Sequence, residues 1–590
     1  MIKFRNETLL FRKIKKLIIS FLIISFPVIS YSKTINDAQI IKYGSSIYSD
    51  FLVLQTSAKR LVFTNNTPLS VGELKFYLTL FDYDSLDENS KRLYDNIHDF
   101  LYEEDNLLTV QDVELGIHPR ITLEGYYKSN SDIPYSFNYF FKDNFISLPL
   151  DLGFGKNFAL GADFFLGKSY IKAADNSNHC NVPVEFDPFS IHRQADFYFP
   201  TFAYIGFGKY YENWGYNVHA GKQGKTVGQT LTGSILYNST FETDGYLEFD
   251  IYSKLVKMTM DVVQVSSNRM DKLQQDNTER YLYLHQFDVN LFKNLKVSFL
   301  EGSLIAAPFS IRFLNPFAVM HQYGGWKNYI TPENAEIYRE TNFCADFAYM
   351  LEYIPVKNLR LYGIYNQIEM QLSYERGNSW GRYYPNSIGA QVGAEYNLFI
   401  NDSSSMLFGL EGFYNSPYMY IKQTPSASLY RARLDMQTKK YVYSWIGSPF
   451  GPDCAGGMFK AEYNAQKWKL ELDYLFVEKG ENNKLLNKSW IDCDDEYYDY
   501  YPSVSYKLRE KGIISDERTN DELYKEAINM NVSGIKEITN QITLKGTYFI
   551  NELFELNGQI VYNYIINNGN IKNNNDSGVE LDLSITYKIF

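Results

Sequence analysis

Apolar and polar residues alternate along most of this chain, from about Ile117 to the last residue, Phe590. The repeating unit is an alternating segment of roughly ten residues, a very short turn, a second such segment and a long polar loop. In the clearest copy, one face holds Trp468, Leu470, Leu472, Tyr474 and Phe476, and the other holds Lys469, Glu471 and Asp473. A period of two predicts a β-strand. Because a strand that crosses a bilayer needs about 9–11 residues and alternates between lipid and a wet lumen, the repeat predicts a transmembrane β-barrel.

Short turns join the predicted strands in pairs and fix their number. They fall near residues 153–156, 210–214, 253–254, 291–293, 354–357, 398–404, 464–466 and 549–553. These eight turns, with the longer segments between them, predict eighteen strands, within a range of sixteen to twenty. In bacterial barrels the short turns and both chain ends face the periplasm, so we expect the longer segments to be extracellular. They lie near residues 128–144, 166–195, 221–243, 266–280, 302–343, 367–387, 415–456, 477–539 and 566–578.

Before the strands, between residues 33 and 115, the apolar period changes from two to about 3.6, which is the period of a helix. Ser70 and Glu73 have the spacing of a capping box, in which each side chain satisfies a free backbone donor at a helix start. Two apolar stripes follow, one at Leu74, Tyr77, Leu78 and Phe81 and one at Leu93, Ile97, Phe100 and Leu101. We expect two antiparallel helices that brace the periplasmic mouth of a barrel formed by residues 116–590. A docking site for a periplasmic partner is the alternative.

The first 32 residues have the form of a signal peptide, with three lysines at 13, 15 and 16, an apolar run from Leu17 to Val28, and cleavage expected after Ser32. A retained membrane anchor is the alternative, although the apolar run is short for a spanning helix. Export makes the four cysteines candidates for disulfides, which four cysteines can form in three connectivities. We expect at most disulfides that link loops. The cysteines are Cys180, Cys344, Cys454 and Cys493.

Composition narrows the class of protein. The chain has 51 Tyr and 42 Phe but only 6 Trp, and both strands and bilayer interfaces enrich aromatic residues. Taken alone, this composition also permits a soluble β-solenoid. The formal net charge of −12 argues against a nucleic-acid partner, because phosphate binding needs a basic surplus.

The expected extracellular loops contain mixtures of aromatic and polar residues that are typical of sugar binding. Rings pack on the apolar face of a pyranose, and charged or amide groups bond its hydroxyls. The candidate ligand-binding residues are Tyr323, Trp326, Lys327, Tyr329, Trp380, Arg382, Tyr383 and Tyr384. Interfacial girdles and loop packing use the same residue types, so a structural role is the alternative for each cluster. The acidic run at 494–501 lacks the calcium-loop spacing, and we predict no metal and no cofactor.

Catalysis has little support in the sequence. His219, His285 and His321 lie in or beside predicted strands, but no G-x-S-x-G or H-E-x-x-H element accompanies them. A lone histidine in a lumen is usually a hydrogen-bonded wall residue. We therefore predict that the protein is not an enzyme, and a barrel hydrolase is the third choice among the functions.

Several short stretches, taken in order, resemble the Wzi capsule-assembly family of outer-membrane barrels. They are Pro68–Leu78, Gly221–Gln223, Glu301–Phe317, Glu411–Tyr418 and Gly447–Asp453. The resemblance implies a periplasmic helical region joined to an eighteen-stranded barrel that acts as a non-catalytic surface lectin for capsular polysaccharide. The chain departs from the family where Gly224–Gly228 lacks the tryptophan of a Trp-Gly-x-Gly run, and in its long loop at 477–539.

Together these observations predict an outer-membrane protein that binds or anchors a surface polysaccharide through extracellular loops. A general diffusion porin or solute channel is the alternative, because a charged lumen also suits an aqueous path. The expected partners are outer-leaflet lipid of the lipopolysaccharide type or another type, the polysaccharide itself, and a possible periplasmic protein at the helical segment.

Overall fold

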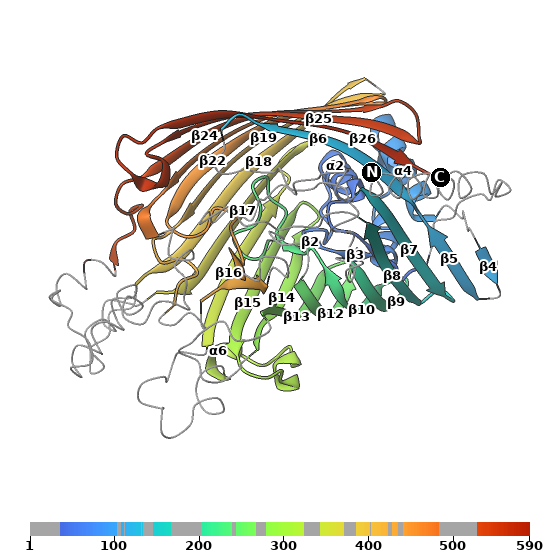
Figure 1. Cartoon of the computed structure of the whole chain (residues 1–590). Coiled ribbons are helices and arrows are strands. Elements are labelled where there is room, and N and C mark those ends of the chain that lie inside the picture. The colour runs from blue at the N-terminus through green and yellow to red at the C-terminus, as the bar shows by residue number, and fades with distance from the viewer. Residues whose placement is uncertain are drawn as a thin grey trace, which may run out of the picture.

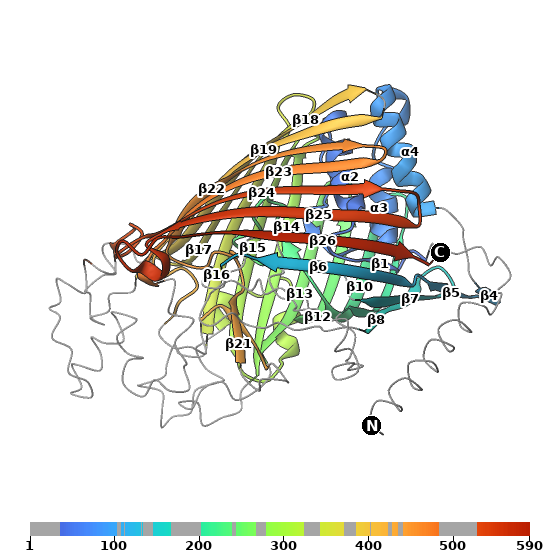
Figure 2. The same cartoon turned by 45° about the horizontal axis from the view of Figure 1, so that its top comes forward.

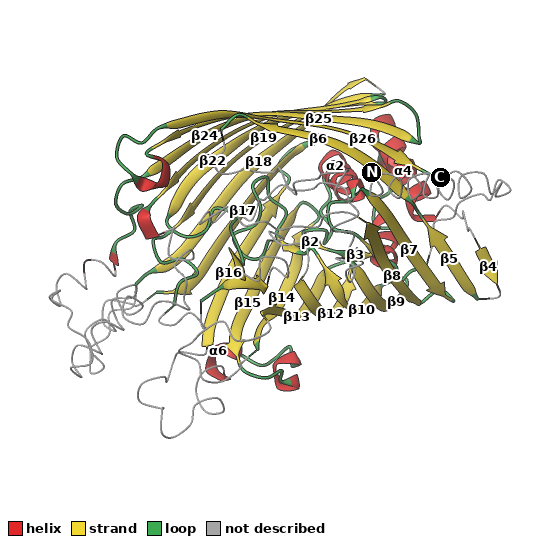
Figure 3. Ribbon diagram, viewed as in Figure 1, coloured by secondary structure: helices red, strands yellow, loops and turns green. Residues whose placement is uncertain are grey.

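A computed structural model of the chain describes residues 36–102, 108–110, 112–130, 133, 145–166, 202–238, 244–266, 279–323, 343–370, 385–401, 403–422, 428–434, 441–482, 525 and 528–589. The expected signal peptide at residues 1–32 lies outside this part of the chain. Strands make up most of the described structure (Figure 3).

One antiparallel sheet closes into a barrel of eighteen long strands (Figure 1). The strands are β6 (Arg120–Lys128), β7 (Ile146–Phe154), β8 (Phe158–Leu166), β9 (Ala203–Tyr210), β10 (Trp214–Gln223), β12 (Asp244–Ser253), β13 (Val256–Ser266), β14 (Arg280–Phe292), β15 (Leu295–Ala306), β16 (Phe343–Tyr353), β17 (Leu359–Glu369), β18 (Ser387–Asn401), β19 (Ser404–Asn415), β22 (Cys454–Ala465), β23 (Trp468–Lys479), β24 (Glu537–Phe549), β25 (Phe554–Ile566) and β26 (Asp576–Lys588). The last strand, β26, pairs with the first, β6, and so leaves no open edge. Two short strands, β4 (Leu108–Val110) and β5 (Val113–Ile117), precede β6.

The predicted division into an apolar outer face and a polar inner face is confirmed along these strands. In β23, Trp468, Leu470 and Leu472 are exposed on the outside, whereas Glu471 and Asp473 are buried. Each of the eight predicted short turns joins two consecutive strands. The C-terminus lies at the end of the barrel that carries these turns, and so do three helices, α2 (Ser46–Ala58), α3 (Val71–Leu78) and α4 (Glu88–Tyr102) (Figure 2). By the rule for bacterial barrels, that end faces the periplasm.

Helices α2, α3 and α4 fill this mouth. The two predicted helices correspond to α3 and α4, whereas α2 was not predicted. Short elements complete the described fold: the 3-10 turns η1 (Tyr83–Ser85), η3 (Ile311–Leu314) and η7 (Asn568–Asn570), helix α6 (Met320–Tyr323), and the strand pairs β1 (Ile40–Ile41) with β3 (Leu69–Ser70), β2 (Asn66–Thr67) with β11 (Thr226–Val227), and β20 (Tyr430–Leu434) with β21 (Tyr441–Trp445). Within the described residues, no helix has the length and apolarity to cross a membrane.

The helices are tied to the short turns of the barrel by backbone hydrogen bonds. The Asn358 amide donates to the carbonyl oxygen of Thr56 at 2.9 Å, and the Leu61 amide donates to that of Lys293 at 2.7 Å. The bracing role predicted for the helical segment is therefore present in the fold. Its alternative, docking of a periplasmic partner, stays a prediction.

Asp50 on α2 gives the helical segment a pH-dependent stability. Burial against the barrel wall raises the pKa of this carboxyl from 3.8 to about 6, although Lys469 opposes the shift. Since the folded state holds the proton more tightly than the unfolded state, stability should fall as the pH rises from about 4 to about 6. We expect Asp50→Asn to remove that slope and to stabilise the protein at pH 7 by about 1–2 kcal/mol. Urea unfolding in detergent micelles across this pH range would measure it, and an unchanged slope would contradict the assignment.

Candidate functional site

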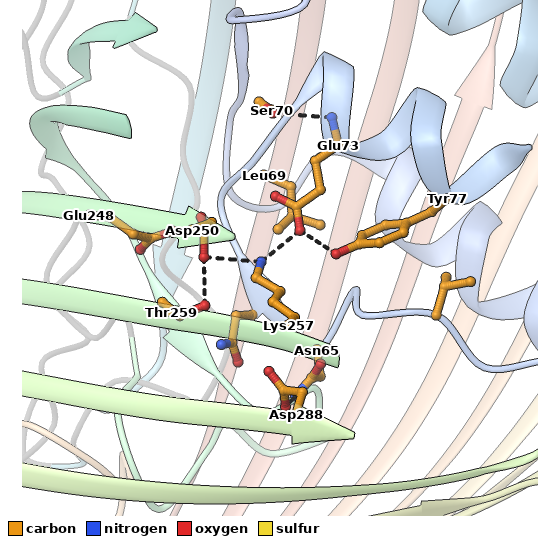
Figure 4. A network of polar contacts seen from close by, with 12 residues as sticks. Asn65, Leu69, Ser70, Glu73, Tyr77, Glu248, Asp250, Lys257, Thr259 and Asp288 are labelled. Carbon is orange, nitrogen blue, oxygen red and sulfur yellow. Dashed lines mark hydrogen bonds and ion pairs between the residues drawn. The ribbon is translucent and has the colours of Figure 1, made fainter. Parts of the chain in front are cut away.

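A buried ion cluster joins helix α3 to the inner wall of the barrel (Figure 4). The Ser70 hydroxyl accepts a hydrogen bond from the Glu73 amide at 3.2 Å, so the serine half of the predicted capping box is confirmed. The glutamate half is wrong, because Glu73 Oε1 lies 2.7 Å from Lys257 Nζ and accepts a hydrogen bond from the Tyr77 hydroxyl at 2.5 Å. A buried ammonium on the wall attracts this carboxylate more strongly than a neutral backbone donor does.

On the wall side of the cluster, Lys257 Nζ also lies 3.3 Å from Asp250 Oδ1, and the Thr259 hydroxyl donates to the same oxygen at 2.5 Å. The side chains of Lys257, Glu73 and Asp250 are all at most 1% exposed. One lysine therefore pairs with two carboxylates, one from the helical segment and one from the barrel.

A second ion cluster lies next to the first, farther along β10, β12 and β13. Lys225 pairs with Glu248 and, at 2.7 Å, with Asp261. His219 uses both ring nitrogens, with Nε2 3.1 Å from Glu248 Oε1 and Nδ1 2.9 Å from the Tyr246 hydroxyl. This histidine is thus a hydrogen-bonded wall residue, as the sequence predicted.

Three of these side chains have the spacing of a metal site. Ligand atoms of His219, Glu248 and Asp250 lie within 4.8 Å of one another. Lys225 and Lys257 already place their ammonium groups against the two carboxylates. Because each carboxylate is already paired with an ammonium group, we assign the group to charge pairing within the wall.

Residues 224–238, which we name the lumen segment, fold into the barrel after β10. The prediction that the whole of 221–243 is extracellular is wrong for this part of the chain. Its strand β11 pairs with β2 beside the helices. The base of the segment closes where the Val227 amide donates to the carbonyl oxygen of Tyr237 at 3.0 Å, so residues 228–236 form a hairpin inside the lumen.

A buried carboxylate on the opposite wall holds the tip of this hairpin. Glu411 on β19 accepts hydrogen bonds from the amides of Leu231 at 2.8 Å and Thr232 at 3.1 Å. Gln391 on β18 donates to the same carboxylate at 2.9 Å. Arg360 on β17 bonds the carbonyl oxygen of Gln229 at 2.8 Å and pairs with Glu395 and Glu352. Side chains from three neighbouring strands, β17, β18 and β19, thus fix the hairpin across the lumen.

The connection between β19 and β22 adds a second inward-folding segment, residues 416–453, which we name the inner loop and which is described in part. The Tyr420 hydroxyl donates to the carbonyl oxygen of Ile235 at 2.6 Å, and Arg431 bonds that of Asn238 at 2.7 Å. Apolar side chains of the lumen segment, the inner loop and strands β12–β17 form one buried cluster. The prediction that 415–456 is wholly extracellular is therefore also wrong, because much of the loop packs inside the barrel.

The predicted ligand-binding residues fall almost wholly outside the described structure. Tyr323 is the last residue of α6, and its role in ligand binding stays a prediction. The other seven, Trp326, Lys327, Tyr329, Trp380, Arg382, Tyr383 and Tyr384, lie in undescribed segments, so their role stays a prediction.

Two of the four cysteines form no disulfide. Cys344 and Cys454 are both buried and free, so none of the three complete connectivities is present. Cys180 and Cys493 lie outside the described residues, and a disulfide between them stays a prediction.

Sequence reasoning missed the residues that hold the lumen segment, namely Arg360, Gln391 and Glu411. A usable signal was present for Glu411, which begins one of the stretches quoted for the family resemblance. Three other such stretches also lie at the inner surface, at Ser70, at Gln223, which bonds Tyr246, and at Asp453, whose amide donates to Ser416. These stretches therefore specify internal packing.

A closed antiparallel barrel with an apolar outer face, a polar inner face and short turns at one end is an outer-membrane β-barrel protein, and this chain resides in the bacterial outer membrane. Its fold is similar to that of Wzi of Escherichia coli, described as an outer membrane protein involved in group 1 capsule assembly and a carbohydrate-binding β-barrel, with a TM-score of 0.52, 10% identity, and coverage of 93% of this chain and 99% of Wzi. The predicted resemblance is therefore confirmed for the fold.

Two other solved structures match at lower TM-scores. OccAB4 of Acinetobacter baumannii matches with a TM-score of 0.39 and 10% identity, over 81% of this chain and 98% of OccAB4. A BenF-like porin of Pseudomonas fluorescens Pf-5 matches with a TM-score of 0.38 and 8% identity, over 81% of this chain and 99% of the porin. No family model and no curated protein matches the sequence.

Proposed function

We propose that this protein binds a surface polysaccharide at the extracellular side of the outer membrane and does not act on it chemically. The observation that carries the proposal is the occupied lumen. The lumen segment and the inner loop pack against β12–β17 in one apolar cluster. A filled lumen suits a closed barrel that carries binding loops better than an open aqueous channel. The carbohydrate binding stated for Wzi, whose fold is similar, is in line with this role.

The binding residues that we propose are the aromatic and basic ones of the extracellular loops, with Trp326 and Trp380 as the main platforms. Lys327 directly follows Trp326, and Arg382 lies two residues after Trp380; both side chains can bond sugar hydroxyls. A tryptophan supplies a large rigid apolar face at low entropic cost, so it suits the apolar side of a pyranose ring. The expected partners are the polysaccharide and the surrounding outer-leaflet lipid.

We expect the purified protein in detergent to bind glycans on an array, and Trp326→Ala or Trp380→Ala to weaken binding about tenfold or more, since loss of an aromatic anchor costs above ~1.4 kcal/mol. Trp468→Ala is the matched control, because Trp468 is exposed on the outer face beside a periplasmic turn. The bound glycan should keep its chain length. Unchanged binding in both loop variants would contradict the assignment of these platforms, and glycan cleavage would contradict the non-catalytic role.

A further inference from the structure

The chain that follows β15 folds back onto the outside of the barrel. Residues 307–323, which we name the outer flap, contain η3 and α6. Phe313 and Met320 of the flap are buried against Val262, Tyr283 and Ile305. Those three wall residues share the outward-facing row, since Val262 lies opposite the outward-facing Leu247 on one side and Tyr283 on the other. The flap therefore covers the lipid side of β13–β16, near α6 in Figure 1.

Polar residues lie beneath the flap, on a face that is otherwise apolar. His285, Glu301 and Ser303 belong to the same outward row and are nevertheless at most 6% exposed. His285 Nε2 lies 2.8 Å from the carbonyl oxygen of Phe313, and Glu301 accepts a hydrogen bond from the His321 amide at 2.9 Å. The wall thus supplies partners for flap backbone groups, and the flap shields wall side chains that lipid could not solvate.

The position of these contacts along β14 and β15, counted from the periplasmic end, places the flap within the bilayer. His285 is seven residues from the periplasmic end of β14, and Glu301 is six residues from the periplasmic start of β15. A tilted strand needs about 9–11 residues to cross the membrane. Both side chains therefore lie inside the membrane-spanning part of their strands, and the flap that covers them reaches into the outer leaflet.

The outer surface of the flap is apolar. Ile311 is 76% exposed and Phe317 is 83% exposed, and Phe309 and Val319 are also exposed. This surface continues the exposed outward row of the neighbouring strand β16, which includes Tyr349. In water, these four flap side chains would lose the favourable free energy that burial in an apolar medium provides.

We propose that the outer flap is a lipid-embedded layer of the barrel wall, which contacts the acyl chains of outer-leaflet lipid through Phe309, Ile311, Phe317 and Val319. The occupant is lipid because the flap lies beside a row of strand residues that faces lipid in any transmembrane barrel. The polar residues beneath it, His285 and Glu301, bond the flap and keep it in place.

Spin labels test this proposal in proteoliposomes of the full chain. Phe317→Cys and Ile311→Cys would each be labelled in a chain in which Cys180 and Cys493 are serine, because Cys344 and Cys454 are buried. Both labels should collide with oxygen far more than with a water-soluble nickel chelate, as a label at Val392 should. Val392 is the lipid control, since it is 62% exposed on the outer face of β18.

A label at Lys572, exposed in the connection between β25 and β26, is the water control. Flap labels that respond to the nickel chelate as Lys572 does would overturn the proposal. Dipolar broadening between flap labels of different molecules would overturn it as well, because it would show that a second copy covers the flap. Migration on a gel before and after heating checks that each labelled barrel is folded.

Discussion

Replacing Lys257 with methionine should release the helical segment from the barrel wall. The substitution removes the ammonium that lies 2.7 Å from Glu73 and 3.3 Å from Asp250, and it leaves both carboxylates buried without a cation. Breaking a buried ion pair in this way costs about 3–5 kcal/mol. The loss should appear as faster amide exchange and protease cleavage in residues 36–102, measured on the folded protein in micelles, while the strands stay protected.

Lys357→Met is the matched control for that experiment. Lys357 pairs with Asp87 of the helical segment at 3.4 Å, but the two side chains are 60% and 50% exposed. A surface pair of this kind contributes about 0–1 kcal/mol, so exchange in the helices should scarcely change. Equal effects of the two substitutions would contradict the dominant role of the buried cluster. A Lys257→Met, Glu73→Leu double variant should recover part of the loss, because only one unpaired carboxylate then remains.

The barrel could be predicted from the sequence because its signals are local. The alternation in β23 and the turn at 464–466 are both contained in a few consecutive residues, and each strand adds to the same count. The lumen segment has no such signal. Its place depends on contacts of Gln229 with Arg360 and of Thr232 with Glu411, which are more than a hundred residues apart in the chain.

Helix α2 was missed for a related reason. Besides Phe51 and Leu54, it buries Gln55 and Thr56, since it packs between α4 and the barrel wall. The polar Gln55 is satisfied by the backbone amide of Val62 and by Thr64, contacts that only the folded loop provides. Helix α3 is buried too, at every residue, but the Ser70 cap marked its start in the sequence, whereas Ser45 before α2 makes no side-chain cap hydrogen bond. The candidate sugar-binding residues rest on composition alone, which does not distinguish a ligand platform from an aromatic girdle.

Removing the lumen hairpin should convert the barrel into a conducting channel. Residues 228–236 would be replaced by Asn-Gly, a two-residue turn that suits the antiparallel bridge between Val227 and Tyr237. Lys225 and its partners Glu248 and Asp261 remain in place, so the wall below the hairpin keeps its charge pairs. An eighteen-stranded barrel is wide enough for an aqueous path, and without the hairpin the inner loop and the periplasmic helices are what remains inside it. We expect little conductance from the native protein in planar bilayers and a several-fold rise, with steady ohmic steps, in the variant.

Glu411→Ala provides the graded comparison, because it removes the acceptor for Leu231 and Thr232 but leaves the hairpin. It should give brief openings of intermediate size, since the tip loses its anchor while Arg360 still holds Gln229. Lys572→Ala, in the exposed connection between β25 and β26, should behave as the native protein does. Large steady steps in the native protein would favour the porin alternative, because they would require a path beside the lumen segment. A folded hairpin variant that stayed closed would contradict the sealing role of the hairpin and assign the seal to the inner loop or to the helices of the periplasmic mouth.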